Sequence, residues 1–426
     1  MSRLTKLEKS WITYDWANSV YATIMMAAIY PVFFSSVMGK GGDGWWAFGT
    51  FLATLVMAIL APVLGAIGDF RGMKKRLLVS FLLLGLTFTL IAGLAGYWPL
   101  MLAAYVLSYI GFMGSNLFYD SFLTDVTTKE RMDKVSAWGY GMGYIGGSTI
   151  PFVLSIILIM AGPSLGLGEV LPVRISIFLA VVWWGLFSIP LLKNVHQRYH
   201  TETPPSRLLQ QAFRNLGETV KNIRKDRAVL VFLIAYFFYI DGVNTVINMA
   251  TSYGATLGLD TTGMILALLV TQLIAFPFAI LFGRLAGKIG SIPMILAAVA
   301  LYSFICILGF VMGLGIEEGF LTVSQALVLF WILAVLVGTS QGGIQALSRS
   351  FFGRIIPPER STEYFGFYDI FGKFAAIMGP GLYSLVKALT GRSSLSILGV
   401  IILFILGGFF ILWNRRILME RDAASR

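Results

Sequence analysis

Charge is scarce in this chain of 426 residues. Asp, Glu, Lys and Arg together make up 12% of it, whereas 57% of the residues are hydrophobic and the mean hydropathy is +0.80. In soluble globular domains about 25% of the residues are charged. The shortage of charge therefore excludes an ordinary soluble domain and indicates a protein that lies mainly in lipid.

Cysteine and histidine are nearly absent. The single cysteine, Cys306, lies in an apolar run, so an intrachain disulfide is excluded and a packing role is predicted. The two histidines, His196 and His200, have the i,i+4 spacing of some metal sites, but no further ligand accompanies them. We therefore predict no metal site.

The motifs of ATP-driven or enzymatic proteins are also missing. A phosphate-binding P-loop requires G-x-x-x-x-G-K-[ST], and the nearest string, Gly283-x-x-x-Gly287-Lys288, has the wrong spacing and lacks the hydroxyl. The sequence contains no set of kinase motifs. We expect neither catalytic residues nor a cofactor.

Long apolar runs fill almost all of the chain. Each has about 20 residues, which is the length that crosses about 30 Å of hydrocarbon. The twelve runs lie at residues 12–37, 46–68, 77–96, 98–124, 135–160, 173–192, 229–257, 262–285, 292–313, 323–352, 363–389 and 394–414. The sequence thus predicts an all-α polytopic membrane protein with twelve transmembrane helices and no separate soluble domain.

Lysine and arginine gather in alternate connections between these runs. One set of connections has little basic charge beyond Lys40, Arg174 and Arg392. The other set is rich in lysine and arginine and includes both ends of the chain. This positive-inside pattern predicts that both termini are cytoplasmic, in what we expect to be the cell membrane. The net charge of +11 then reflects topology, and no nucleic-acid partner is expected.

The longest polar connection, from Lys193 to Arg227, separates six apolar runs from six. We predict an N-terminal six-helix bundle over residues 1–193, a cytoplasmic linker over 194–228 and a C-terminal six-helix bundle over 229–426. After Pro205 the linker has helical periodicity with basic residues on its outer face. This pattern fits either a helix on the membrane surface or a solvated linker.

The two predicted halves repeat each other. The stretch Phe122–Pro151 aligns with Phe351–Pro380 without a gap, at a constant offset (380 − 151 = 229). The polar residues that open the first apolar run, Asp15-x-x-Asn18-Ser19, recur in the seventh run as Asp241-x-x-Asn244-Thr245 (241 − 15 = 226). An internal repeat of six helices on six is typical of secondary transporters, whose substrate site lies between the repeats.

A loop after the second run points to a superfamily. "GAIGDFRGMKKR", from Gly65 to Arg76, resembles the G-x-x-x-D-x-x-G-[RK]-[RK] loop of the major facilitator superfamily. The resemblance implies the major facilitator fold with two pseudo-symmetric halves. It also implies a cytoplasmic latch formed by Gly65, Asp69, Arg71 and Gly72 between helices 2 and 11, which stabilises one of the alternating conformations.

Two further blocks resemble one branch of that superfamily. "YDWANSV" from Tyr14, together with the block from Asn116 to Gly147, is similar to the vacuole-effluxer-like (autophagy-related 22-type) branch. The matching positions of the second block are Asn116, Ser121, Phe122, Asp125, Ser136, Gly139, Gly143, Tyr144, Gly146 and Gly147. Fungal members are associated with amino-acid export from the vacuole, so the resemblance implies an amino acid as the leading substrate.

Polar residues recur at helical spacing inside the apolar runs, where a lipid-facing position would be costly. We interpret them as lining a substrate or ion cavity, and the alternative is hydrogen bonding that only fixes helix packing. The candidate residues are Asp15, Asn18, Asn116, Tyr119, Asp120, Tyr140, Tyr144, Asp241, Asn244, Asn248, Thr251, Gln341, Gln345, Arg349, Asp369 and Lys373.

Four charged positions in this set carry specific hypotheses. Asp120 and Arg349 are at matched repeat positions (349 − 120 = 229), so they are candidates for an ion pair that closes a gate. Alternatively, Arg349 neutralises Asp369. Asp369 also has the i,i+4 spacing of an ion pair with Lys373, which either is self-neutralised or binds a substrate carboxylate.

The repeated Asp-x-x-Asn pattern suggests ion coupling. We predict that Asp241 carries a proton or ligates sodium, because its polar stripe is the longer one. Asp15 is predicted to be a structural or gating residue.

The function that follows is transport of a small polar solute, most simply as a monomer among membrane lipids. Export by alternating access, with possible coupling to H⁺ or Na⁺, is the leading hypothesis. A lipid scramblase or a sugar symporter on the same fold remains as an alternative. A non-transporting receptor is a weaker one, since no sizeable signalling domain is present.

Overall fold

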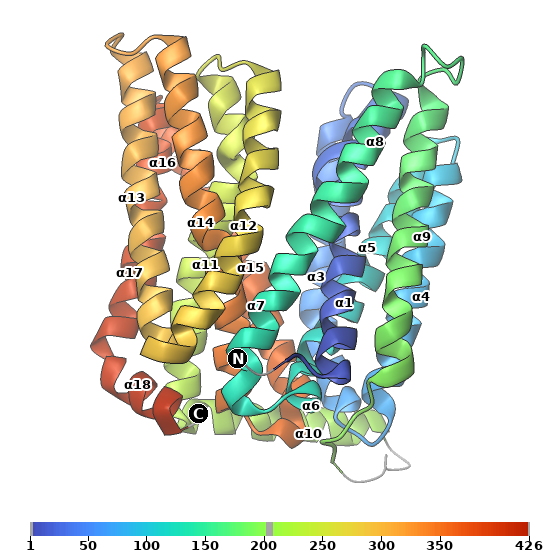
Figure 1. Ribbon diagram of the computed structural model, residues 1–426, viewed down its shortest axis with the longest axis vertical. Coiled ribbons are helices and arrows are strands. Elements are labelled where there is room, and N and C mark those ends of the chain that lie inside the picture. The colour runs from blue at the N-terminus through green and yellow to red at the C-terminus, as the bar shows by residue number, and fades with distance from the viewer. Residues whose placement is uncertain (1–2, 202–207, 425–426) are drawn as a thin grey trace. The chain divides into compact units, whose positions relative to one another are not determined.

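The computed structural model describes residues 3–201 and 208–424, and it is almost entirely helical (Figure 1). Side chains at positions 43, 208, 209, 261 and 374–377 are also outside the description, as are residues 202–207 of the predicted linker. Within the described residues, eleven helices are long and apolar enough to cross a membrane. The predicted eleventh run corresponds to a further long helix, α15 (Ser361–Thr390). The predicted all-α membrane fold is confirmed.

The chain forms two compact units that differ from the predicted halves by two exchanged segments. Unit 1 consists of residues 1–128, 142–219 and 356–367. Unit 2 consists of residues 129–141, 220–355 and 368–426. Thus the start of the fifth predicted run packs in unit 2, and the start of the eleventh packs in unit 1.

Unit 1 contains the helices that follow from the first six apolar runs. They are α1 (Lys6–Tyr21), the π-helix η1 (Ala22–Ala28), α2 (Ile29–Met38), α3 (Gly42–Gly68), α4 (Met73–Leu94), α5 (Trp98–Ser121), α6 (Leu123–Val126), the π-helix η3 (Gly143–Thr149), α8 (Ile150–Ala161) and α9 (Val170–Asn194). Helices α4, α5 and α9 lie side by side (Figure 1). The core that these helices form with α1 is aromatic, with Tyr21, Tyr105 and Trp184 almost completely buried.

Small residues let the helices of unit 1 approach closely. A Cβ atom added at Gly111 of α5 would lie 2.3 Å from the backbone nitrogen of Gly85 in α4. Such contacts are how helices associate in lipid, where no hydrophobic force drives them together. The backbones of α4 and α5 are therefore in direct contact.

Unit 2 contains most of the remaining helical elements, both short and long. They are the short 3₁₀ turn η2 (Lys129–Arg131), α7 (Met132–Met142), α11 (Arg227–Thr256), α12 (Thr261–Ile289), α13 (Ser291–Glu317), α14 (Val323–Ile355), most of α15, α16 (Ser393–Gly399), α17 (Ile401–Trp413) and α18 (Arg415–Ala424). A second 3₁₀ turn, η4 (Pro358–Arg360), precedes α15 and belongs to unit 1. Tyr253, Met312 and Phe330 are central to the core of unit 2.

The second part of the predicted linker is helical. Helix α10 (Leu208–Lys225) has buried positions at Ala212 and Thr219, whereas Phe213 is 61% exposed. Ala212 packs against Ala66 and Ile67 of α3 within unit 1. The periodicity seen in the sequence is therefore that of an amphipathic helix packed on the end of α3.

Candidate functional site

The polar residues of α1 bind to α5 inside unit 1. The side-chain amide of Asn18 donates a hydrogen bond to Oδ1 of Asn116, at 2.6 Å. One turn along α5, the ring of Tyr119 is stacked on Trp11 and lies against Tyr14. Asp15 is buried on α1, and Asp120 is half-buried on α5. The structure therefore brings Asn18, Asn116 and Tyr119 into one cluster between α1 and α5.

The glycines of the fifth run pack on the signature stretch of α1. A Cβ atom at Gly143 would lie 2.6 Å from Oγ of Ser19, and one at Gly147 would lie 2.5 Å from Cβ of Ser19. A Cβ atom at Gly146 would overlap the ring of Trp16. Part of the "YDWANSV" stretch is thus a packing surface for the π-helix η3, which also contains the half-buried Tyr144.

Asp241 on α11 is fully buried and bonds to the backbone of α15. Its Oδ1 accepts a hydrogen bond from the N–H of Gly379, at 2.9 Å, next to Pro380. Pro380 lies inside α15, and the carboxylate of Asp241 links α11 to this part of the helix through the N–H of Gly379. Oδ2 of Asp241 and Oγ1 of Thr245 are buried without a hydrogen-bond partner among the described residues.

The rest of the α11 stripe is more accessible than Asp241. Asn244 and Thr251 are half-buried, and Asn248 is exposed. The polar face of α11 is thus fully buried at Asp241 and partly accessible at the three later positions.

Arg349 on α14 is buried and held by α7. Its Nε donates to Oγ of Ser136, at 2.9 Å, and its guanidinium lies 4.3 Å from the ring centre of Tyr140. These contacts lie in unit 2, with Gln345 half-buried and Gln341 2% exposed on the same helix. The predicted partner Asp120 belongs to unit 1, so their coupling stays a prediction.

Asp369 and Lys373 form an ion pair along α15. Nζ of Lys373 lies 2.6 Å from Oδ2 of Asp369, and the two side chains are 17% and 16% exposed. The pair therefore neutralises itself while keeping some access to its surroundings.

Asp69, at the C-terminal end of α3, caps α15. Its two carboxylate oxygens accept the backbone N–H groups of Thr362 and Glu363, each at 2.9 Å. Gly65 makes this approach possible, because a Cβ atom there would lie 2.5 Å from the carbonyl oxygen of Thr362. Arg71 is exposed and makes no ion pair within the described residues, and Gly72 adopts a positive φ of 76° where α4 begins. A carboxylate at a helix N-terminus is favourable because it satisfies otherwise unpaired N–H groups.

Lys74 is the cation that reaches α15. Its Nζ lies 2.8 Å from Oδ2 of Asp125 and 2.9 Å from Oγ of Ser361, and its side chain is fully buried. Oδ1 of Asp125 accepts the backbone N–H groups of Arg198 and Tyr199. One ion pair thus ties α4 and α6 to the segment after α9 and to the first residue of α15.

Unit 2 has a corresponding charged cluster centred on Arg354 of α14. Its Nη1 lies 2.6 Å from Oδ2 of Asp133 in α7, and its Nη2 lies 2.8 Å from Oδ1 of Asp422 in α18. Ser291, the first residue of α13, donates its hydroxyl to Asp133 and its N–H to Asp422, both at 2.9 Å. Ser350 also donates to Asp133.

The exchanged segments contact equivalent positions in the two units. Gly65 of α3 packs against Thr362, and Gly283 of α12 packs against the backbone oxygen of Asp133. Thr362 and Asp133 are related by the repeat offset (362 − 133 = 229). In each unit, therefore, a glycine allows close packing against the first residues of a helix that belongs to the other sequence repeat.

Comparison with known proteins agrees with this architecture. The sequence model of the family described as "Vacuole effluxer Atg22 like" matches residues 47–421. The chain belongs to this Atg22-like family. An uncharacterized MFS-type transporter of Bacillus subtilis, YxiO, is 43% identical over 421 residues, covering 96% of this chain and 94% of that protein. The Atg22-like chain is thus a membrane transporter of the major facilitator type.

Fungal relatives match over a shorter range. Autophagy-related protein 22-2 of Aspergillus clavatus is 27% identical over 285 residues, which is 62% of this chain and 45% of that protein. Matches to the fungal proteins thus span less than half of their length.

Solved structures share the fold. The outward-facing crystal structure of a bacterial homologue of the iron transporter ferroportin superposes with a TM-score of 0.71 at 14% identity, covering 96% of this chain and all of that one (100%). The proton:xylose symporter XylE, bound to 6-bromo-6-deoxy-D-glucose, gives 0.70 at 14% identity and covers 96% of this chain and 95% of its own.

Sequence reasoning on the Atg22-like chain missed most of the charged residues that hold the exchanged segments. Lys74 and Asp125 were visible only as motif positions, and Asp133, Arg354 and Asp422 were not singled out. A signal was present, because Asp125 and Arg354 occupy matched repeat positions (354 − 125 = 229) with opposite charge. Opposite charges at equivalent places indicate that each is neutralised by a different local partner.

The contact of Asp69 with α15 is expected to depend on pH. Burial raises the pKa of Asp69 to about 6, against the opposing effects of Lys74 and of the N–H groups of Glu363 and Thr362. If the released carboxyl has its ordinary pKa of about 4, the docked contact is strongest when Asp69 is protonated and weakens as pH rises through about 6. Between pH 5 and pH 7 the docking equilibrium should weaken several-fold, up to about tenfold.

This is measured by alkylation of a cysteine placed at Thr362, which is buried, in a chain with Cys306→Ala. The rate for Asp69→Asn with the same cysteine serves as the reference, because thiol reactivity itself changes with pH. The ratio of the two rates should rise with pH. A ratio that stays constant from pH 5 to pH 7 contradicts the assignment.

Loss of Arg354 should be strongly destabilising. Arg354→Met leaves Asp133 and Asp422 buried without their shared cation, which costs about 3–5 kcal/mol by analogy with broken buried ion pairs. Adding Asp133→Asn and Asp422→Asn should recover much of the thermal stability of the purified protein. Arg416→Met is the matched control, since the Arg416–Glu420 pair is exposed. Equal melting temperatures for Arg354→Met and the control would contradict this account.

Proposed function

We propose that this protein exports a small polar solute, with an amino acid as the leading substrate, by alternating access in the cell membrane. Membership of the Atg22-like family is the observation that carries the proposal, because its description names efflux. The two exchanged segments support it, since an alternating transporter needs contacts that form in one state and break in another. We further propose cytoplasmic termini and a monomeric transporter.

The proposed substrate class fits the chemistry of α15. An amino acid at neutral pH has a carboxylate and an ammonium group, so its site needs a cation and an anion. Lys373 and Asp369 supply one of each and retain partial exposure. We propose that Lys373 binds the substrate carboxylate, with Asp369 restraining the lysine until substrate arrives.

Transport by purified protein in liposomes tests this proposal. Amino acids are compared with sugars and with a fluorescent phospholipid, which separates the three substrate classes. Lys373→Met should reduce amino-acid transport by at least about tenfold, because one charge-assisted contact is lost. Lys387→Met, on the same helix, should leave it unchanged. Movement of phospholipid alone would replace the proposal by a scramblase.

Asp241 is the proposed coupling residue. Its Oδ2 is buried without a hydrogen-bond partner among the described residues, beside the hydroxyl of Thr245. Such an oxygen can take up a proton, or ligate sodium together with other oxygens. Asn at this position keeps the acceptor for the N–H of Gly379 but cannot change charge.

Asp241→Asn should therefore abolish accumulation driven by a proton or sodium gradient while sparing substrate exchange. Asp15→Asn, at the matched repeat position, should slow both processes. Accumulation by Asp241→Asn with unchanged pH and sodium dependence would show that Asp241 only fixes the packing of α11 on α15.

A further inference from the structure

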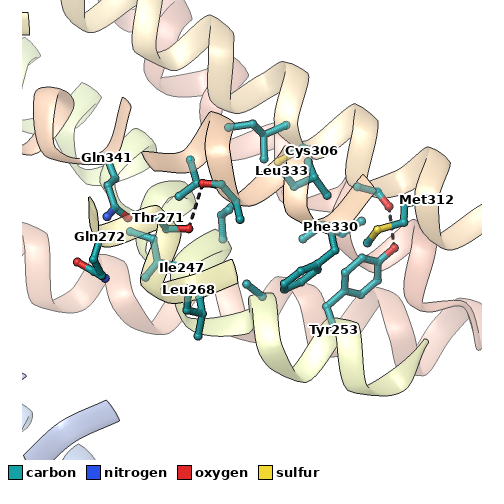
Figure 2. A pocket seen from close by; sticks show the side chains of 17 residues that line it. Ile247, Tyr253, Leu268, Thr271, Gln272, Cys306, Met312, Phe330, Leu333 and Gln341 are labelled. Carbon is teal, nitrogen blue, oxygen red and sulfur yellow. Dashed lines mark hydrogen bonds between the residues drawn. The ribbon is translucent and has the colours of Figure 1, made fainter. Parts of the chain in front are cut away.

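Two cavities, one in each unit, differ in charge. The cavity in unit 2 has a volume of about 80 Å³, and all of its lining residues are uncharged (Figure 2). The cavity in unit 1 is larger, about 670 Å³, and lies between the start of α4 and the segment that follows α9. Among the described residues its lining has no acidic side chain and five basic ones, which are Arg71, Lys75, Arg76, His196 and His200. This basic cavity therefore favours an anion.

Hydrogen bonds fix the two walls of the basic cavity to each other. The N–H of Gly72, just before α4, donates to Oε1 of Gln197 at 2.9 Å. Nε2 of Gln197 donates to the carbonyl oxygen of Gly68, at 3.1 Å. Nζ of Lys75 donates to the carbonyl oxygen of Val195, at 2.9 Å. The basic side chains therefore project from a backbone that these bonds hold in place.

The lysine and arginines of the basic cavity have no counter-charge among the residues that the structure describes. Arg71, Lys75 and Arg76 make no ion pair there, whereas the neighbouring Lys74 is paired with Asp125. Both arginines are exposed. An exposed guanidinium can bind a phosphate group through two parallel N–H donors, and a lysine ammonium has two donors left after one hydrogen bond. The cavity thus contains unused donors of the kind that phosphate binds.

The two histidines of the cavity fit an anion better than a metal ion. Nδ1 of His196 lies 3.2 Å from the carbonyl oxygen of Asn194, and Nδ1 of His200 lies 3.0 Å from that of Thr201. A carbonyl oxygen only accepts hydrogen bonds, so each ring donates from Nδ1 and keeps Nε2 for another partner. Three permanent cations line the same cavity and repel a metal ion, whereas a bound anion favours a protonated Nε2 that donates to it.

The basic cavity lies at the depth of the lipid headgroups. Helix α4 is apolar enough to cross a membrane from Met73 to Leu94, which is 22 residues. A helix of that length extends about 33 Å, against about 30 Å of hydrocarbon. The first turn of α4, which contributes Lys75 and Arg76 to the cavity, is therefore at the boundary between lipid and water.

An apolar surface continues from the cavity along the same face of α4. Arg76, Ser80 and Leu83 are all exposed and follow i, i+4, i+7. Arg76 and Ser80 line the cavity, and Leu83, one turn beyond Val79 and Ser80, is 56% exposed. A phosphate in the cavity is thus next to a helix face that suits a hydrocarbon chain.

We propose that the basic cavity binds the phosphate group of an anionic phospholipid, with an acyl chain along α4 at Leu83. Basic pockets at the membrane surface are how proteins recognise such headgroups. Free phosphate has the same oxygens, but the headgroup depth and the apolar surface beside the cavity favour the lipid. The proposal holds whichever solute the protein carries, because lipid binding is measured without transport.

The histidines provide a direct readout, since the chain has two and both line the cavity. Protein labelled with ¹³C at histidine Cε1 and purified without a histidine tag is placed in nanodiscs of phosphatidylcholine. Replacing phosphatidylcholine by phosphatidylglycerol at constant pH should shift both Cε1 signals until they saturate. Millimolar inorganic phosphate in pure phosphatidylcholine should leave them in place. A shift with inorganic phosphate and none with phosphatidylglycerol would assign the cavity to a free anion and overturn the proposal.

A pair of variants separates the site from the general charge of the bilayer, which also attracts protons. Arg76→Gln removes a cation of the cavity. Lys193→Gln is the matched control, because Lys193 is an exposed cation at the end of α9 that does not line the cavity. Arg76→Gln should need about fivefold more phosphatidylglycerol for the same shift, and Lys193→Gln should titrate like the parent protein. Equal responses of the two variants would show that surface potential alone moves the signals.

Mass spectrometry of the intact protein gives a second measurement that does not depend on histidine protonation. Protein released from nanodiscs with equal amounts of the two lipids should retain phosphatidylglycerol in preference to phosphatidylcholine. Arg76→Gln should lose most of this preference, and Lys193→Gln should keep it. The same lipid retention by the parent protein and Arg76→Gln would contradict a site in this cavity.

Discussion

In each unit, buried carboxylates accept hydrogen bonds from backbone N–H groups and thereby stabilise the charged end of that unit. Asp69 binds two N–H groups of α15, Asp125 binds two after α9, and Asp422 binds the N–H of Ser291. In an apolar protein these contacts satisfy two needs at once, since helix N-termini have unpaired donors and buried carboxylates need partners. The long helices can therefore begin at defined positions although their ends are buried.

This arrangement explains why the two units are stable with segments exchanged between the repeats. Arg354 has two carboxylates, one on the exchanged segment at Asp133 and one on α18 at Asp422. If the exchanged segment leaves, Asp422 still neutralises Arg354. Arg354 is therefore neutralised from two different elements of unit 2.

The sequence was sufficient to predict the transmembrane helices, because length and hydropathy alone determine which segments can cross a membrane. The run predicted at residues 173–192, for example, corresponds to α9 (Val170–Asn194), with ends shifted by only a few residues. The charged clusters were not predictable in this way. Whether Lys74 binds Asp125 or faces water depends on the position of α6, which periodicity does not encode. Asp241 shows the same limit, since its partner, the N–H of Gly379, lies 138 residues farther along the chain.

The repeat is gapless in sequence, but its backbone is wound differently in the two copies. Residues 143–149 form the π-helix η3, whereas the matched residues 372–378 lie within the α-helix α15. A π-helix closes its hydrogen bonds over five residues instead of four, so equal numbers of residues make fewer turns. Side chains beyond this point therefore face different directions in the two copies. Two copies of one ancestral pattern can in this way present unlike surfaces without any insertion or deletion in the chain.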